Sequence, residues 1–92
     1  WITVFKGNQA GRISTLYPNP TTNTTHLDYQ LADKQTATLQ LYDLTGRQLQ
    51  THNLSGTGTY NLSLGNYPSG IYFCTILVDD VVIKTEKIVL SR

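Results

Sequence analysis

Short segments in which polar and apolar residues alternate recur along the chain, and clusters of turn-forming residues separate them. In residues 24–31, Leu27 and Leu31 fall on one face of such a segment, whereas His26 and Asp28 fall on the other. Alternation with a period of two is typical of a β-strand that buries one face and exposes the other. Comparable segments predict about seven strands, at residues 12–17, 24–31, 36–44, 47–54, 59–64, 71–78 and 81–90.

The composition agrees with a β-sheet protein. Threonine, which favours strands, supplies 14 of the 92 residues, whereas alanine, glutamate, lysine and methionine together supply eight. This imbalance excludes a helical bundle. Short, regularly spaced strands with turns between them predict an all-β fold, namely an immunoglobulin-like β-sandwich of about seven antiparallel strands. A small β-barrel is the alternative.

Charge and cysteine content exclude several classes of protein. The net charge is only +1 and the seven lysines and arginines are scattered, so no basic face for nucleic acid is expected. Cys74 is the single cysteine, which forbids an intrachain disulfide and a cysteine-based zinc site. Its place in an apolar strand predicts a buried, inert thiol. No apolar run approaches the roughly 20 residues of a membrane-spanning helix.

The sequence contains few residues that suggest catalysis or metal binding. His26 and Asp28 would share a strand face, but two ligands make a weak metal site, and a solvated face is expected instead. His52 is expected at the surface. Asp79 and Asp80 are expected to form a hairpin turn, because a calcium site needs at least about six oxygen ligands. We therefore expect no catalytic residue, no metal and no cofactor, and we do not expect an enzyme.

Six tyrosines raise an alternative function, that of a carbohydrate-binding or adhesive module appended to a secreted enzyme. A sugar-binding platform needs exposed, coplanar aromatic rings. Alternation places Tyr29 and Tyr60 on inward faces, so packing in the core is the better interpretation of these two rings. The carbohydrate-binding module stays open as the second hypothesis.

Several short strings of residues follow one another in a distinctive order. They are Tyr-Pro-Asn-Pro at residues 17–20, Leu-Tyr-Asp-Leu-Thr-Gly-Arg at 41–47, Gly-Thr-Tyr-Asn-Leu at 58–62, Pro-Ser-Gly-Ile-Tyr at 68–72, and Lys-Thr-Glu-Lys-Ile-Val-Leu at 84–90. In this succession, residues 12–92 resemble the C-terminal sorting domain of the type IX (Por) secretion system of Gram-negative bacteria.

The resemblance implies a secretion signal that directs cargo across the outer membrane. The implied partners are the outer-membrane translocon, a sortase that removes the domain and leaves the cargo anchored at the cell surface, and an upstream cargo domain in the same chain. The implied location is the periplasm in transit, then the cell surface or the extracellular space. Residues 1–11 would be a linker or a remnant of the cargo, and residues 12–92 the sorting domain. Cleavage by the sortase is expected within residues 7–14.

The resemblance also singles out particular residues. Those that match the family's motifs are Pro18, Asn19, Pro20, Asp43, Gly46, Arg47, Gly70 and Tyr72. Those expected to contact the translocon form the closing segment, Lys84, Thr85, Glu86, Lys87, Ile88, Val89 and Leu90. An edge strand offers unpaired amides and carbonyls that another β-structure can extend. We expect the translocon to recognise such an edge here, and the same edge would support a homodimer formed by strand exchange.

Overall fold

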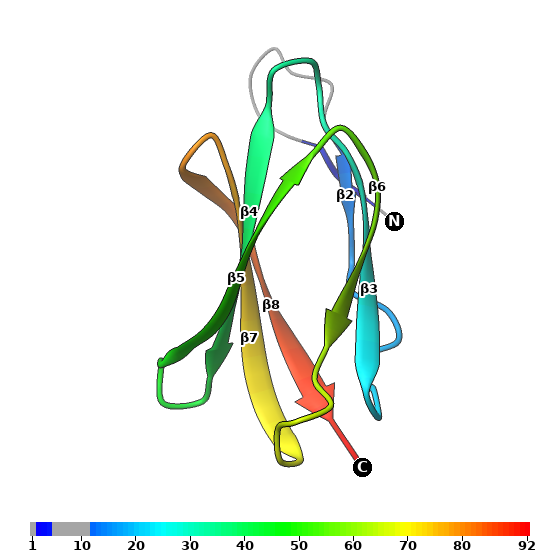
Figure 1. The fold of residues 1–92 in the computed structure, drawn as a ribbon, viewed down its shortest axis with the longest axis vertical. Coiled ribbons are helices and arrows are strands. Elements are labelled where there is room, and N and C mark those ends of the chain that lie inside the picture. The colour runs from blue at the N-terminus through cyan, green and yellow to red at the C-terminus, as the bar shows by residue number, and fades with distance from the viewer. Residues whose placement is uncertain (1, 5–11) are drawn as a thin grey trace.

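The computed structural model describes residues 2–4 and 12–92, which form eight strands in two facing sheets (Figure 1). One sheet has the order β1-β2-β3-β6 and the other the order β5-β4-β7-β8. Every strand pairing is antiparallel. The strands are β1 (Ile2–Val4), β2 (Arg12–Ser14), β3 (Thr24–Gln30), β4 (Thr36–Asp43), β5 (Gln48–Ser55), β6 (Thr57–Ser63), β7 (Gly70–Val78) and β8 (Val81–Leu90).

The all-β, immunoglobulin-like sandwich predicted from the sequence is confirmed. Strands β2 to β8 correspond to the seven expected segments, and they form two separate sheets rather than a single closed barrel. The part of the chain that the structure describes contains no helix long and apolar enough to cross a membrane.

The core lies between the two sheets and consists of the apolar residues that alternate along the strands. Burying one such side chain contributes about 1.5–3 kcal/mol. Tyr29 and Tyr60 pack against this core while partly buried, as the alternation predicts. The apolar side chains with at most 2% exposure are Ile13, Leu27, Ala37, Leu39, Leu41, Leu62, Leu64, Cys74, Ile76, Ile88 and Leu90.

Cys74 is buried, as expected. Burial, reinforced by the negative charge of Glu86, raises the pKa of its thiol to about 12. The thiol is therefore neutral near pH 7, and a neutral thiol is a poor nucleophile. The predicted burial of this cysteine is confirmed, and the raised thiol pKa agrees with the expected low reactivity.

Strand β5 departs from simple alternation. Its pairing register with β4 shifts between Leu41 and Tyr42, which leaves Leu49 as an extra residue in the ladder. Such a bulge reverses the face to which later side chains point. As a result Leu54 is buried in the core and Leu49 also packs against it, although their spacing in the sequence would place them on opposite faces.

The chain then crosses from one sheet to the other at Gly56. This residue has a φ of +69°, a left-handed conformation that glycine adopts without steric strain. The predicted strands at residues 47–54 and 59–64 leave residues 55–58 as the turn between them, but that extent is wrong, because β5 continues to Ser55 and β6 begins at Thr57. A single glycine makes the corner.

Two further features complete the sheets: the hairpin between β7 and β8, and a short strand pairing near the N-terminus. Asp79 and Asp80 form the expected two-residue turn between β7 and β8, with φ of +50° and +67°. A two-residue hairpin turn of type I′ needs this left-handed backbone at both turn positions. Within residues 1–11, β1 pairs with β2 and adds an edge strand to the sheet that contains β3 and β6. Residues 1 and 5–11 lie outside the described part of the chain.

Candidate recognition surface

Most of the motif residues gather at one end of the sandwich, the lower end in Figure 1. Asp43 at the end of β4 pairs with Tyr72 near the start of β7, and Tyr72 in turn pairs with Ile88 near the end of β8. The loop before β3 reaches the same end from the other sheet. We call this region the motif end and define it as residues 17–20, 43–47, 68–72 and 88–92. The Asp79–Asp80 turn lies at the opposite end.

Asp43 organises the turn between β4 and β5. Its Oδ1 accepts hydrogen bonds from the backbone amides of Thr45 and Arg47, both at 3.0 Å, and from the Thr45 hydroxyl at 2.6 Å. Its Oδ2 lies 3.2 Å from Nε of Arg47. Gly46 occupies the position with a φ of +92°. Asp43, Gly46 and Arg47 therefore act together to fix the shape of this turn.

The Asp43 turn makes stability depend on pH. Hydrogen bonds from the Thr45 hydroxyl and from the Arg47 amide are the main causes that lower the pKa of Asp43 below its ordinary value of 3.8. A carboxyl whose pKa is lowered by folding stabilises the folded state above its ordinary pKa, and this stabilisation is lost as the pH falls through the lowered value.

We expect Asp43→Asn to be less stable than the unmodified protein at neutral pH, with the difference shrinking as the pH falls below the ordinary carboxyl pKa and through the lowered pKa of Asp43. The asparagine keeps an acceptor oxygen, so the comparison isolates the charge. Urea unfolding at several pH values measures the difference. Asp28, whose pKa is also lowered, is present in both proteins and cancels. A difference that does not change with pH would contradict the assignment.

A shallow depression of about 260 Å³ lies between this turn and the beginning of β7. Two of the apolar side chains that line this depression face solvent, namely Leu44 with 67% exposure and Ile71 with 38%. Tyr72 lies beneath them, buried, and its hydroxyl donates to the Pro68 carbonyl at 2.6 Å. The depression is lined by Asp43, Leu44, Thr45, Ser69, Gly70, Ile71 and Tyr72. Exposed apolar side chains on a shallow surface suit contact with another protein.

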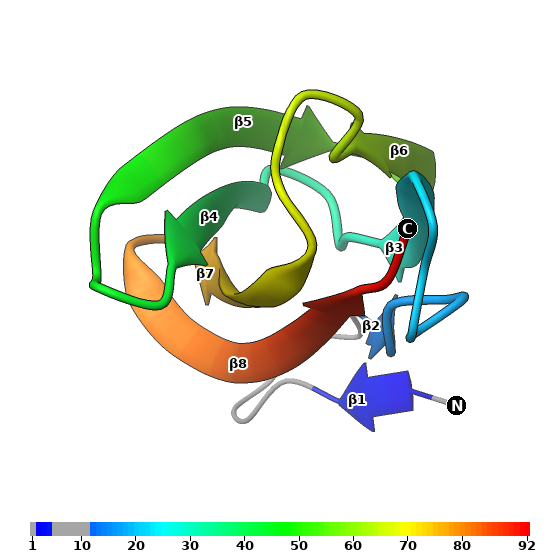
Figure 2. The same ribbon diagram turned by 90° about the horizontal axis from the view of Figure 1, so that it is seen from below.

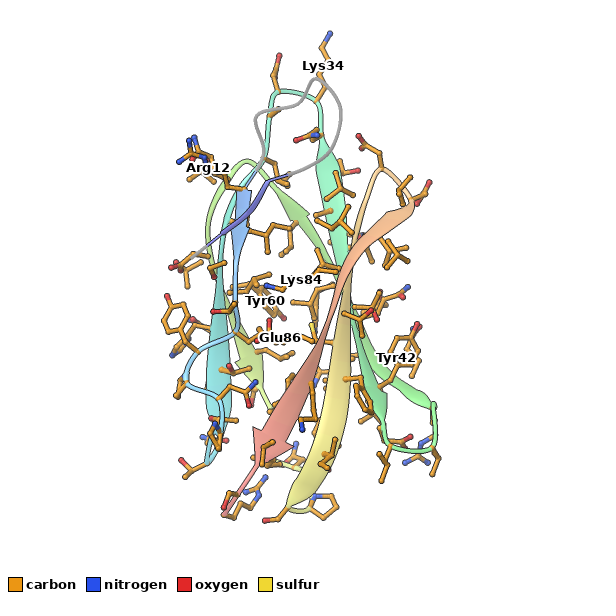
Figure 3. All side chains as sticks on the ribbon, turned by 180° about the vertical axis from the view of Figure 1, so that it is seen from behind. Arg12, Lys34, Tyr42, Tyr60, Lys84 and Glu86 are labelled. Carbon is orange, nitrogen blue, oxygen red and sulfur yellow. The ribbon has the colours of Figure 1, made fainter. Side chains whose placement is uncertain are left out.

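The closing segment presents different chemistry on its two faces. Lys84 and Glu86 point from β8 into the space between the sheets, as Figure 3 shows. Their charged groups are 3.4 Å apart, and both side chains are less than one-fifth exposed. Thr85 and Lys87 are exposed on the outward face, and Val89 is half-buried there. Ile88 and Leu90 are fully buried. Only part of the predicted contact segment is therefore accessible to a partner.

The two inward-facing charges bind the backbone of the opposite sheet. Both carboxylate oxygens of Glu86 lie 3.1 Å from the amide nitrogen of Leu16, and Nζ of Lys84 donates to the carbonyl of Ser14 at 3.2 Å. These side chains connect β8 to the end of β2 and to the residues that follow it. Charged groups turned inward at a sheet edge also discourage pairing with another chain.

Further along, the backbone edge of β8 is already hydrogen-bonded. The Asn19 side chain donates to the Lys87 carbonyl at 2.7 Å and accepts from the Val89 amide at 3.0 Å, as a neighbouring strand would. Thr21 continues the pattern, because its amide donates to the Val89 carbonyl and its carbonyl accepts from the Ser91 amide. β8 does lie at the edge of its sheet, but the edge from Lys87 to Ser91 is occupied.

We call this set of contacts between residues 14–21 and residues 84–91 the seam. Figure 2, which views the molecule from the motif end, shows β8 curving toward the chain between β2 and β3. The seam brings two predicted sets together, Asn19 from the first motif and residues 84–90 from the last. Sequence patterns do not reveal the partners in this contact, Ser14, Leu16 and Thr21, because the role of these residues depends on others far away along the chain.

The other polar candidates have structural partners. Asp28 accepts from the hydroxyls of Tyr17 and Thr59, both at 2.7 Å, and Nδ1 of His26 lies 2.7 Å from Oδ1 of Asn61. Nε2 of His52 lies 2.6 Å from Oε1 of Gln50. Among residues 2–4 and 12–92, no three His, Cys, Asp or Glu side chains come close enough together to hold a metal ion.

Comparison with protein-family models matches residues 15–91 to the secretion system C-terminal sorting domain. The match covers the seam except for Ser14, and the motif end except for Arg92. A search of the curated proteins finds no match.

Proposed function

The chain belongs to the family of secretion system C-terminal sorting domains, and we propose that the motif end is the surface through which the export machinery recognises it. Members of this family are the C-terminal secretion signals of type IX cargo, and this is the function of the domain. The observation that carries the proposal is the convergence of residues from separate motifs on one exposed end that has apolar contact points.

The outer-membrane translocon is the proposed partner at this end. Leu44 and Ile71 supply exposed apolar area, and the exposed Lys87 of β8 pairs with Phe73, two residues from Ile71 along β7. We expect recognition through side chains rather than by strand addition along residues 87–91, because that part of the edge already has its hydrogen bonds. Val89 lies within the motif end, and Lys87 and Thr85 continue the outward face of β8 beyond it; these three residues of the closing segment are proposed to touch the partner.

Strand exchange between two copies is restricted by the same contacts. While the seam is closed, a homodimer that pairs β8 with β8 of a second copy can use only the backbone edge of residues 81–86. Val81 and Val82, with 62% and 58% exposure, are the apolar side chains available in that stretch. We keep the homodimer as a secondary proposal, to be tested by the mass of the protein in solution across a range of concentrations.

Later steps of export are also proposals. The family implies delivery of cargo to the cell surface or the extracellular space. We propose transit through the periplasm, removal of the domain by a sortase and surface anchoring of an upstream cargo. Within the expected cleavage range of residues 7–14, Arg12–Ser14 forms β2 and pairs with strands on both sides, which protects it from a protease. The remaining residues, 7–11, lie outside the described part of the chain.

A reporter fused in front of the chain, in a bacterium with a type IX system, tests the proposed surface. The fusion should reach the outside of the cell. We expect Leu44→Ser to reduce the exported fraction about tenfold, because it removes an exposed apolar contact without disturbing the core. Val81→Ser is the matched control, since it changes a similarly exposed side chain at the opposite end. Equal export of the two variants, with unchanged melting temperatures, would reject the motif end as the recognition surface.

The carbohydrate-binding alternative is not favoured by the family assignment. A second depression, about 410 Å³ at the end opposite the motifs, is lined by Thr36, Thr38, Asn53, Leu54, Ser55 and Asp80. None of these is aromatic, so this depression lacks the ring stacking typical of sugar sites.

A further inference from the structure

The seam joins two segments that run in the same direction. Its contacts link Ser14 to Lys84, Leu16 to Glu86, Asn19 to Lys87 and Val89, and Thr21 to Val89 and Ser91, so both residue numbers rise together. The bridge between Thr21 and Leu90 is accordingly parallel, whereas the strand pairings within the sheets are antiparallel. Parallel alignment decides how the contacts respond to tension along the chain.

Tension between the two ends of the domain acts along the seam. Arg12 lies toward the upper end of the sandwich in Figure 3, and the C-terminal end of the chain lies at the lower end in Figure 1. Pulling these points apart drives residues 14–21 upward and β8 downward, so the segments must slide past one another. The contacts of the seam then share the load, instead of being broken one after another.

The antiparallel ladder between β7 and β8 is loaded in the same way. Tension on the end of β8 acts along that strand, and nine residue pairs from Gly70–Leu90 to Val78–Val81 resist the sliding. The β8 strand is thus held on both sides. Unfolding under force is governed by the barrier to unfolding, which is high when many bonds must break at once.

We infer that the domain is a load-bearing handle: the seam resists tension applied between the upstream chain and the C-terminal end. The inference rests on the proposed function, in which cargo is attached upstream and the export machinery holds the motif end. Asn19 is the central residue of the seam, because its amide supplies two contacts to β8. The load passes from cargo to machinery through the folded domain, without unfolding it.

Single-molecule force measurements on the full chain test this inference through the direction of pulling. In one geometry the handles are the N-terminus and the C-terminus. In the other, they are the N-terminus and a cysteine introduced by Asp80→Cys, at the upper turn between β7 and β8. The second geometry pulls the seam apart from its Lys84 end, contact by contact. Cys74 is buried with a raised thiol pKa and does not compete for the handle.

We expect the unfolding force to be several-fold higher for the pair of termini than for the N-terminus and residue 80. We also expect Asn19→Ala to lower the force between the termini, with Asn61→Ala, a matched change outside the seam, leaving it unchanged. Equal forces in the two directions, or equal effects of the two variants, would overturn the inference. The directional comparison needs no seam variant, so it stands even if Asn19→Ala fails to fold.

The force measurement and the export assay fail independently. A chain that exports its reporter but unfolds at the same force in both directions is a sorting signal and not a handle. A chain with a strong directional difference that exports nothing retains the mechanical property and loses the proposed function.

Discussion

Removal of residues 87–92 is expected to unfold the domain and, with it, to abolish export of an attached reporter. The deletion takes away Ile88 and Leu90, which are 0% and 1% exposed. Truncating one such side chain costs about 2–5 kcal/mol, and a domain of this size has about 5–15 kcal/mol in total. It also removes the seam contacts of Asn19 with Lys87 and Val89. Circular dichroism and urea unfolding measure the loss of structure directly.

This deletion alone cannot separate recognition from folding, and a variant on the outer face of β8 does so. Lys87→Glu changes an exposed side chain and leaves its carbonyl free to accept from Asn19. If the translocon contacts this residue, Lys87→Glu loses export with little change in stability. A folded, fully exported 87–92 deletion would refute the role given to β8 in the core, and with it the interpretation of this strand as a structural part of the signal.

Replacement of Glu86 by alanine is expected to destabilise the domain by about 2–4 kcal/mol, the largest effect of any single polar substitution here. The carboxylate accepts a hydrogen bond from the backbone amide of Leu16, a buried residue, and forms an ion pair with Lys84. Alanine leaves that amide without its acceptor and leaves the lysine charge in a largely enclosed place. Chemical denaturation of the purified variant gives the free energy of unfolding.

Two comparisons test the cause of that loss. Glu86→Gln keeps an acceptor oxygen for the Leu16 amide and should cost less than alanine. Arg47→Ala breaks the other ion pair, whose arginine side chain is 76% exposed, and should change stability little. If Glu86→Ala and Arg47→Ala have similar effects, the inward-facing pair contributes no more than a surface pair, and the structural role assigned to the seam is wrong.

Alternation and turn residues were sufficient to predict most of the fold. The seven strands from β2 to β8 lie where the sequence predicts them, since period-two patterning reports directly on which face is buried. The spacing of Leu49 and Leu54 puts them on opposite faces unless a bulge intervenes, and the β4–β5 pairing contains one. These signals are local, so they can be interpreted without knowing how the sheets meet.

The seam could not be predicted in this way. Asn19 reads locally as a turn residue between two prolines, and its partner Val89 lies 70 residues away along the chain. Similarly, Lys84 and Glu86 break the apolar pattern of their face, which in a sequence looks like a solvated edge. Their structural role is evident only in the folded protein, where they form hydrogen bonds with the Ser14 carbonyl and the Leu16 amide of the opposite sheet. The chemistry of these contacts depends on tertiary geometry, and no spacing rule encodes it.

The pairing of Leu16 with Glu86 across 70 residues also has a consequence for translation. A domain folds as a unit, and here the Leu16 amide gains its acceptor only when β8, the last of the described strands, is in place. A nascent polypeptide that stops before β8 cannot complete its architecture. The native fold therefore forms only when translation has continued through β8, and prematurely terminated products are left open to proteolysis.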